Sequence, residues 1–202
     1  MEKLVLKQLG YPADTTADDA VIEQVRRALH EVEQQANFQY VYAQYDKPLD
    51  FLAENEGYQQ YLAGAEGFLL CATTLGVQVD KYLKRLQMTD MSYAVVFDAA
   101  ASVFLENAAD KYEAALPFSN LSYRFCPGYA GTPLQDNRTI AEILHADRIG
   151  ITFLDSGLMV PMKSMVGIIK IGDTSRKSCT GCVASINCSF RQHGTTCWSE
   201  KR

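Results

Sequence analysis

The sequence of 202 residues lacks any apolar run that could span a bilayer, because the longest runs, such as Tyr93–Phe97, fall far short of the roughly 20 residues required. It also lacks an apolar signal segment, since charged residues follow Met1. An excess of positive charge is missing too, and a net charge of -5 argues against nucleic acid as the main partner. These absences predict a cytoplasmic protein that engages neither membrane nor nucleic acid.

No internal repeat and no low-complexity linker divides the chain, and an apolar fraction of 48% suits a single buried core. The charge is nevertheless uneven. Residues 1–162 carry twelve basic and twenty-two acidic side chains, whereas the remainder carries seven basic and two acidic ones. This asymmetry predicts a main domain at residues 1–172 and a separate tail at residues 173–202.

Short-range patterns predict both helices and strands. Apolar residues recur at helical spacing after Asp19, Gly76 and Tyr93, whereas shorter runs are rich in aromatic or alternating residues. Helices are expected at residues 19–35, 79–86, 93–116 and 138–145, and strands at residues 38–45, 67–74, 121–125, 151–154 and 164–171. With helices foremost in the first half and strands in the second, the fold class is α+β.

The segment Arg124–Pro133 is the most informative part of the chain. Its two glycines and two prolines predict a turn whose backbone a ligand can approach closely. Arg124 offers a planar fork for a carboxylate, and Tyr129 offers a flat face for an adenine or a sulfonium. Taken alone, these features also fit an ordinary surface turn with an arginine.

Two spaced motifs carry a family resemblance. Arg124-x-x-x-Gly128-Tyr129-x-x-x-Pro133 resembles the adenosylmethionine-binding signature of the activation domain of cobalamin-dependent methionine synthase, and Met159-x-Pro161-x-x-Ser164-x-x-Gly167 resembles a second signature of that family. The resemblance covers roughly residues 65 to 171 and includes Asp80 and residues 72–76 and 98–102. It implies a curved, mostly antiparallel sheet with packed helices, here in a free-standing form.

The resemblance also implies a set of ligand contacts. Arg124 would hold the carboxylate of S-adenosylmethionine, the backbone at Cys126 and Gly128 would contact its polar edges, and Tyr129 would line the pocket. The acid that should meet the ligand's amino group stays unassigned. Cys126 is either a small turn residue or a reactive thiol, and the first interpretation is favoured because no base is evident beside it.

The tail contains four of the six cysteines, in the pattern Cys179-x-x-Cys182-x5-Cys188-x8-Cys197. In a reducing compartment such spacing favours a metal site, either a structural zinc or an iron–sulfur cluster. Free cysteines, or disulfides if the protein is exported, are the alternatives. An iron–sulfur cluster would suit the implied chemistry better, because zinc is redox-silent.

The implied function is reactivation of oxidised cobalamin by reductive methylation. The partner would be a cobalamin-binding methionine synthase or corrinoid methyltransferase that lacks its own activation domain, with an electron donor such as flavodoxin or ferredoxin. The sequence offers no convincing acid–base pair or nucleophile triad, and this chemistry needs none. The alternative is a non-catalytic adaptor or iron–sulfur electron carrier that docks on a corrinoid protein.

Overall fold

A computed structural model gives the structure of residues 1–11, 17–174, 177, 179, 182 and 186–198. The helices are α1 (Glu2–Gln8), α2 (Asp19–Gln35), α3 (Asp50–Ala53), α4 (Glu56–Leu62), α5 (Val77–Thr89), α6 (Met91–Ala114), α7 (Asp136–Ile143), the 3-10 helix η1 (Ala146–Ile149) and α8 (Ser189–Gln192). The strands are β1 (Gln39–Tyr45), β2 (Gly67–Thr74), β3 (Thr152–Phe153), β4 (Met159–Val160) and β5 (Ser164–Ile171).

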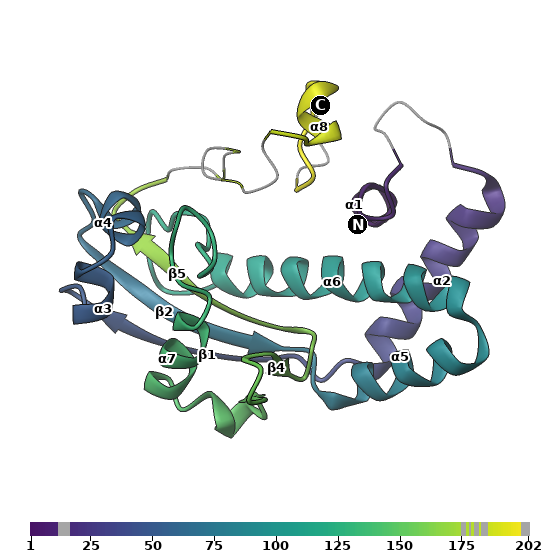
Figure 1. The fold of residues 1–202 in the computed structure, drawn as a ribbon, viewed down its shortest axis with the longest axis horizontal. Helices are drawn as coiled ribbons and strands as arrows, with labels where there is room; N and C mark the ends of the chain where they lie inside the picture. The colour runs from purple at the N-terminus through teal and green to yellow at the C-terminus, as the bar shows by residue number, and fades with distance from the viewer. Residues whose placement is uncertain (12–16, 175–176, 178, 180–181, 183–185, 199–202) are drawn as a thin grey trace.

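The centre of the fold is an antiparallel sheet of three strands in the order β1-β2-β5 (Figure 1). Cys71 in β2 pairs with Tyr42 on one side and with Gly167 on the other. All eight residues of β2 are buried, as its almost unbroken apolar sequence predicts for a central strand. β3 and β4 form a separate hairpin. The predicted α+β class with an antiparallel sheet is confirmed.

Helix α6 connects the two ends of the molecule (Figure 1). It begins after Asp90, whose side chain accepts a hydrogen bond of 3.0 Å from the backbone N–H of Tyr93, and it ends before Pro117. Its first half packs with α1, α2 and α5 around a core that includes Val25, Leu83 and Phe97. Its last turns lie over the sheet.

The two faces of the sheet carry different cores, since successive side chains of a strand point to opposite sides. Phe68 and Leu70 join a core with residues of α4 and α7, such as Tyr58 and Ile140. Leu69 and its alternate neighbours face the other core, which residues 116–121 help to close. The sheet is therefore covered on both faces, and functional side chains must enter from its edges or ends.

Several sequence expectations need correction. The strand expected at residues 121–125 is reduced to two isolated bridges, from Leu121 to Ile171 and from Phe125 to Ile168. The second half is not strand-rich as expected, because β3 and β4 have two residues each, whereas β1 and β2 lie before residue 75 at the predicted positions. The short helices α3 and α4 were not predicted, although Tyr58, Tyr61 and Leu62 of α4 do lie at helical spacing, because a stripe of three residues is a weak signal.

Within the described part of the chain, no helix combines the length and the apolar character needed to cross a membrane.

Candidate ligand-binding site

The turn after Phe125 is anchored at the edge of the sheet. Phe125 and Ile168 exchange two backbone hydrogen bonds of 2.8 Å each, so the turn begins at a fixed point beside β5. Gly128 has a φ of +98°, which favours glycine, and its N–H donates to the Thr132 hydroxyl at 3.0 Å. That hydroxyl in turn donates to the Tyr129 carbonyl at 2.7 Å. The turn is therefore closed by its own hydrogen bonds.

Helix α4 supports the same turn from outside. A Cβ atom on Gly57 would lie 2.6 Å from the Ala130 carbonyl oxygen and 2.8 Å from a methyl carbon of Thr132. Only a glycine lets the turn approach α4 this closely. The hydroxyl of the buried Tyr58 donates to Asp136 at 2.9 Å and fixes the start of α7. The turn is thus held between two helices and the sheet.

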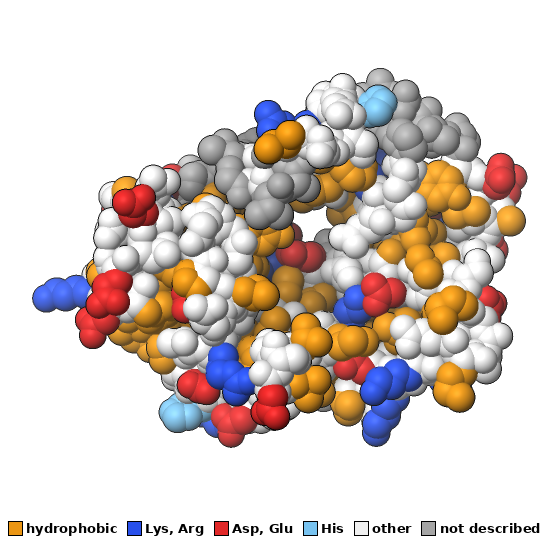
Figure 2. Space-filling model, viewed as in Figure 1, with side chains coloured by type: hydrophobic (Ala, Val, Ile, Leu, Met, Phe, Trp, Pro, Cys, Tyr) orange, Lys and Arg blue, Asp and Glu red, His pale blue; other side chains and the backbone are white. Residues whose placement is uncertain are grey.

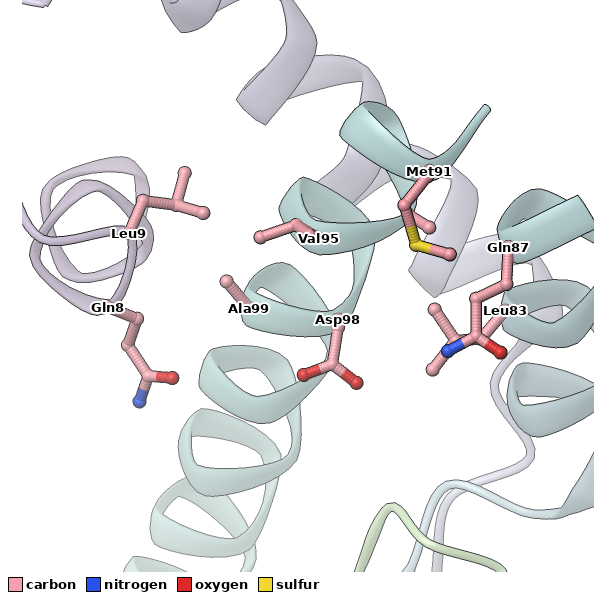
Figure 3. Close-up of a pocket in the computed structure, with 9 residues that line it drawn as sticks. Gln8, Leu9, Leu83, Gln87, Met91, Val95, Asp98 and Ala99 are labelled. Carbon is pink, nitrogen blue, oxygen red and sulfur yellow. The ribbon is translucent and has the colours of Figure 1, made fainter. Parts of the chain in front are cut away.

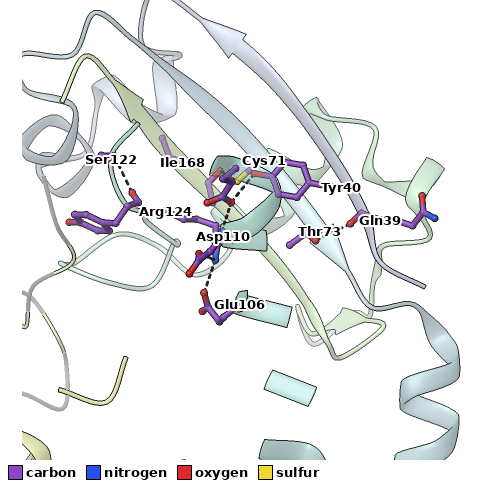
Figure 4. A network of polar contacts seen from close by, with 12 residues as sticks. Gln39, Tyr40, Cys71, Thr73, Glu106, Asp110, Ser122, Arg124 and Ile168 are labelled. Carbon is purple, nitrogen blue, oxygen red and sulfur yellow. Dashed lines mark hydrogen bonds and ion pairs between the residues drawn. The ribbon is translucent and has the colours of Figure 1, made fainter. Parts of the chain in front are cut away.

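Arg124 extends from the sheet edge to α6, as Figure 4 shows. Its stem passes over Gly167, where a Cβ atom would lie 2.4 Å from the Arg124 Cγ. The two sequence signatures therefore meet in space: the glycine that ends the second signature makes room for the arginine that begins the first. This close approach gives a physical reason for a glycine in the middle of β5.

The Arg124 guanidinium is paired with three carboxylates of α6. One nitrogen donates to Glu106 at 2.6 Å and to Asp110 at 3.3 Å, and the other donates to Glu113. The Arg124 side chain is only 4% exposed, whereas Glu106 is 44% and Asp110 69% exposed. The predicted contact of Arg124 with a ligand carboxylate would therefore require one of these acids to give way.

These charges shape the electrostatics of the site. Burial alone would lower the pKa of Arg124, but the carboxylates of Glu113 and Glu106 raise it above its ordinary value. Burial also raises the pKa of Glu113, although Arg124 opposes the effect. Burial likewise raises the pKa of Asp110, and Lys177 joins Arg124 in opposing the effect. Three carboxylates thus face two cations, and when all three are ionised they would attract a further cationic group.

Sequence reasoning missed these three acids. Glu106, Asp110 and Glu113 follow one another at spacings of four and three, which places them on one face of a helix. That signal was present, but it resembled the solvated face of any long helix. Only the arrival of Arg124 from a distant segment distinguishes this face.

Tyr129 and Cys126 complete the predicted set. The Tyr129 side chain is 49% exposed at the rim of the turn, where its ring remains accessible. Burial raises the pKa of the Cys126 thiol to about 11, so that it stays protonated near neutral pH. This supports the interpretation of Cys126 as a small turn residue over that of a reactive thiolate.

The second signature reaches the same helix further along. Ser164 donates to the Pro161 carbonyl at 2.7 Å, and the backbone N–H of Met162 donates to Asp80 at 2.7 Å. Lys163 then extends to α6, where its Nζ lies 2.8 Å from Asp98 and 2.9 Å from the Ser102 hydroxyl. Both signatures thus place a cation against α6.

The contacted residues Asp98, Ser102, Glu106 and Asp110 form one polar stripe along α6, because each lies four residues after the last. Figure 2 shows this view of the molecule hollowed at its centre, with acidic and apolar side chains at the edge of the hollow. In Figure 1, α6 crosses this region, with α1 and the described parts of the tail on one side of it and the sheet on the other.

A separate cavity of about 340 Å³ lies between α1, α5 and α6 (Figure 3). Leu9, Leu83, Met91 and Val95 contribute to its lining. Among the described residues that line it, Asp98 alone carries a charge, and that carboxylate already pairs with Lys163. The cavity therefore offers little to a ligand that carries both charges, and the turn with its neighbouring stripe remains the better candidate.

The predicted metal ligands lie in the tail. Cys179, Cys182, Cys188 and Cys197 are all free thiols. Among the residues whose positions are given, no three His, Cys, Asp or Glu side chains come together in a way that could hold a metal ion. The tail nevertheless touches the main domain, since Lys7 of α1 donates to the Thr196 carbonyl at 2.8 Å.

The described structure thus combines an antiparallel sheet, a long helix along it and a turn after Arg124 at the edge of the sheet. The chain is similar to the crystal structure of the MetH reactivation domain bound to AdoHcy, with a TM-score of 0.53, 15% identity, and coverage of 89% of this chain and 76% of that one. At this identity the likeness shows the fold alone. No family model matches the sequence, and no curated protein does.

Proposed function

We propose that this chain binds S-adenosylmethionine at the turn 124–133 and supports reductive methylation of oxidised cobalamin on a partner protein. The observation that carries the proposal is that Arg124 passes over Gly167 and reaches the polar stripe of α6 at one edge of the sheet. The fold, shared with a reactivation domain solved with AdoHcy, supports it further.

The charges of the proposed ligand match those of the site. S-adenosylmethionine carries a carboxylate, an ammonium and a sulfonium. Arg124 would hold the carboxylate, and the partly exposed Glu106 or Asp110 would turn to the ammonium, which would supply the acid that the sequence left unassigned. Backbone groups at Cys126 and Gly128 would contact polar edges of the ligand. The exposed face of Tyr129 would lie beside the adenine or the sulfonium.

In the proposed reaction the chain contributes position and charge rather than acid–base catalysis. One electron from a donor such as flavodoxin or ferredoxin would reduce the cobalamin bound to the partner. Transfer of the methyl group would break its bond to sulfur and leave the electron pair there, giving methylcobalamin and S-adenosylhomocysteine. The partner would be a methionine synthase or a corrinoid methyltransferase without an activation domain.

Calorimetry with S-adenosylmethionine and S-adenosylhomocysteine tests the binding step. Tyr129→Ala should weaken binding about tenfold, as expected for loss of an aromatic contact to a cation, whereas Tyr129→Phe should bind nearly as the wild type. Arg124→Lys keeps the charge but loses the fork, so it should also weaken binding. Binding unaffected by both Tyr129→Ala and Arg124→Lys would refute this site.

One observation favours a second function, a non-catalytic adaptor on a corrinoid protein. The Arg124 guanidinium is buried and already neutralised by carboxylates, as in a purely structural ion cluster. An adaptor of this kind would not bind S-adenosylmethionine in calorimetry, yet it would co-purify with a corrinoid partner. The same titration therefore separates the two functions.

For the tail, we infer from sequence spacing alone that Cys179, Cys182, Cys188 and Cys197 bind zinc or an iron–sulfur cluster. The described thiols are not gathered into such a site, so binding would require the tail to rearrange. Metal analysis and a visible spectrum after anaerobic purification decide the matter. Stoichiometric iron with charge-transfer absorption supports a cluster, and colourless zinc supports a structural site. A preparation that contains neither metal refutes both.

A further inference from the structure

No strand in the described part of the chain neighbours the outer edge of β1. β1 is the first strand in the order β1-β2-β5, and its seven residues pair with β2 on one side only. Among the described residues, no backbone hydrogen bond from another segment reaches the opposite side. The outward N–H and C=O groups of β1 are thus a template on which a further strand could pair.

Edge strands usually carry features that prevent such pairing, such as lysine, proline, a bulge or a covering segment. The sequence of β1, Gln-Tyr-Val-Tyr-Ala-Gln-Tyr, contains no charge, no proline and no glycine. Its register with β2 is unbroken over all seven residues, so no bulge turns the edge away. Helix η1 contacts β1, but within the segments that the structure describes it forms no backbone hydrogen bond with the strand. The edge therefore keeps backbone groups that could pair with a further strand.

The strand can also pair with a second copy of itself without placing like charges opposite each other. If two copies pair in antiparallel fashion around Tyr42, Val41 lies opposite Ala43 and Tyr40 lies opposite Gln44. Each pair shares one face of the sheet, because its members differ by an even number of positions. The flanking charges Asp46 and Lys47 would lie opposite uncharged residues 38 and 37, so no like charges meet.

We propose that β1 is a docking surface for a second copy of this chain, and that two sheets join there into one of six strands. The candidate ligand site lies at the other end of the strand order, since its turn is bridged to Ile168 in β5. Pairing through β1 leaves both sites open. The proposal therefore stands independently of the proposed function.

Sedimentation velocity of the full chain tests the association. The wild type should shift with rising concentration from a monomer of 22.5 kDa toward twice that mass. The exposed residues Gln39 and Gln44 are then replaced together, because lysine on an edge strand opposes pairing. The Q39K/Q44K variant should raise the dissociation constant of the dimer at least about tenfold, equivalent to about 1.4 kcal/mol.

A control carries the same added charge away from the edge, in the exposed residues Gln24 of α2 and Gln87 of α5. The Q24K/Q87K variant should dimerise as the wild type does. Amide hydrogen exchange of the wild type gives a second measure, since protection at residues 39–45 should grow with concentration. A wild type that stays monomeric, or a dimer whose exchange at 39–45 does not depend on concentration, overturns the proposal.

Discussion

Gly167 is the residue at which the two signature segments depend on each other. Gly167→Ala would place a Cβ atom 2.4 Å from the Arg124 Cγ and force the arginine away from its acids. We expect the free energy of unfolding to fall by about 1–3 kcal/mol, as for other overpacked sites. Urea unfolding measures this change.

A double-mutant cycle separates this mechanism from a general strand effect. In an Arg124→Ala background the stem is gone, so Gly167→Ala should cost much less. An equal cost in both backgrounds would mean that the glycine serves the strand and not the arginine.

Protonation of Glu31 should change the free energy of unfolding at acidic pH. Burial alone would raise its pKa, but hydrogen bonds from Arg27, Tyr93 and Tyr82 lower it below the ordinary 4.5. Because the pKa is lower in the folded state, the stabilisation is present above the unfolded pKa and is lost as the pH falls through the folded one. The wild type should therefore lose stability more steeply than Glu31→Gln below about pH 4.5. Parallel urea-unfolding curves would contradict this assignment.

Among the elements, α6 supports both the helical core and the candidate site, so its start is a sensitive point. The Asp90 side chain caps the helix through the Tyr93 N–H at 3.0 Å. Asp90→Ala should lower the free energy of unfolding by about 1 kcal/mol, whereas Asp90→Asn, which can still accept the bond, should cost much less. Thermal unfolding of both variants measures the difference. Equal losses would show that charge, not capping, matters here.

Local sequence patterns predicted most of these elements, because the spacing of apolar residues shows which side of a helix or strand is buried. The apolar spacing of residues 19–35 and the alternation of residues 38–45 gave α2 and β1 nearly to the residue. The Arg124–Pro133 turn could also be found, since glycine and proline mark turns. What spacing could not give is the meeting of Arg124 with Glu106 and Asp110, because such a contact depends on how β5 and α6 are packed.

In the whole molecule, the two proposed surfaces lie at opposite edges of the sheet. The edge at β5 carries the arginine turn, and the edge at β1 carries the uncharged strand. Helices α4 and α7 cover one face between these edges, and residues 116–121 with the end of α6 cover the other. A protein of this size can thus have a ligand site and an association surface that do not compete.

The contribution of the C-terminal tail to stability follows from where the buried cores lie. Among the residues that the structure describes, none of the three buried cores contains one after Ile171, so the described apolar burial lies within the main domain. A chain that ends after Thr174 keeps these cores and the ion pair of Lys170 with Asp173 at 2.6 Å. It loses the hydrogen bond from Lys7 to the Thr196 carbonyl. We therefore expect cooperative urea unfolding with a loss of at least about 0.5–1.5 kcal/mol, the net worth of this hydrogen bond alone.

Lys7→Met in the full chain is the matched control, because it removes the same donor while the tail stays in place. Its loss of stability should resemble that of the shortened chain. If the shortened chain instead unfolds without cooperativity while Lys7→Met remains stable, the tail belongs to the folding unit and the boundary near residue 172 is wrong. If both behave as expected, the main domain folds independently of the tail, because among the described residues the two share no buried core.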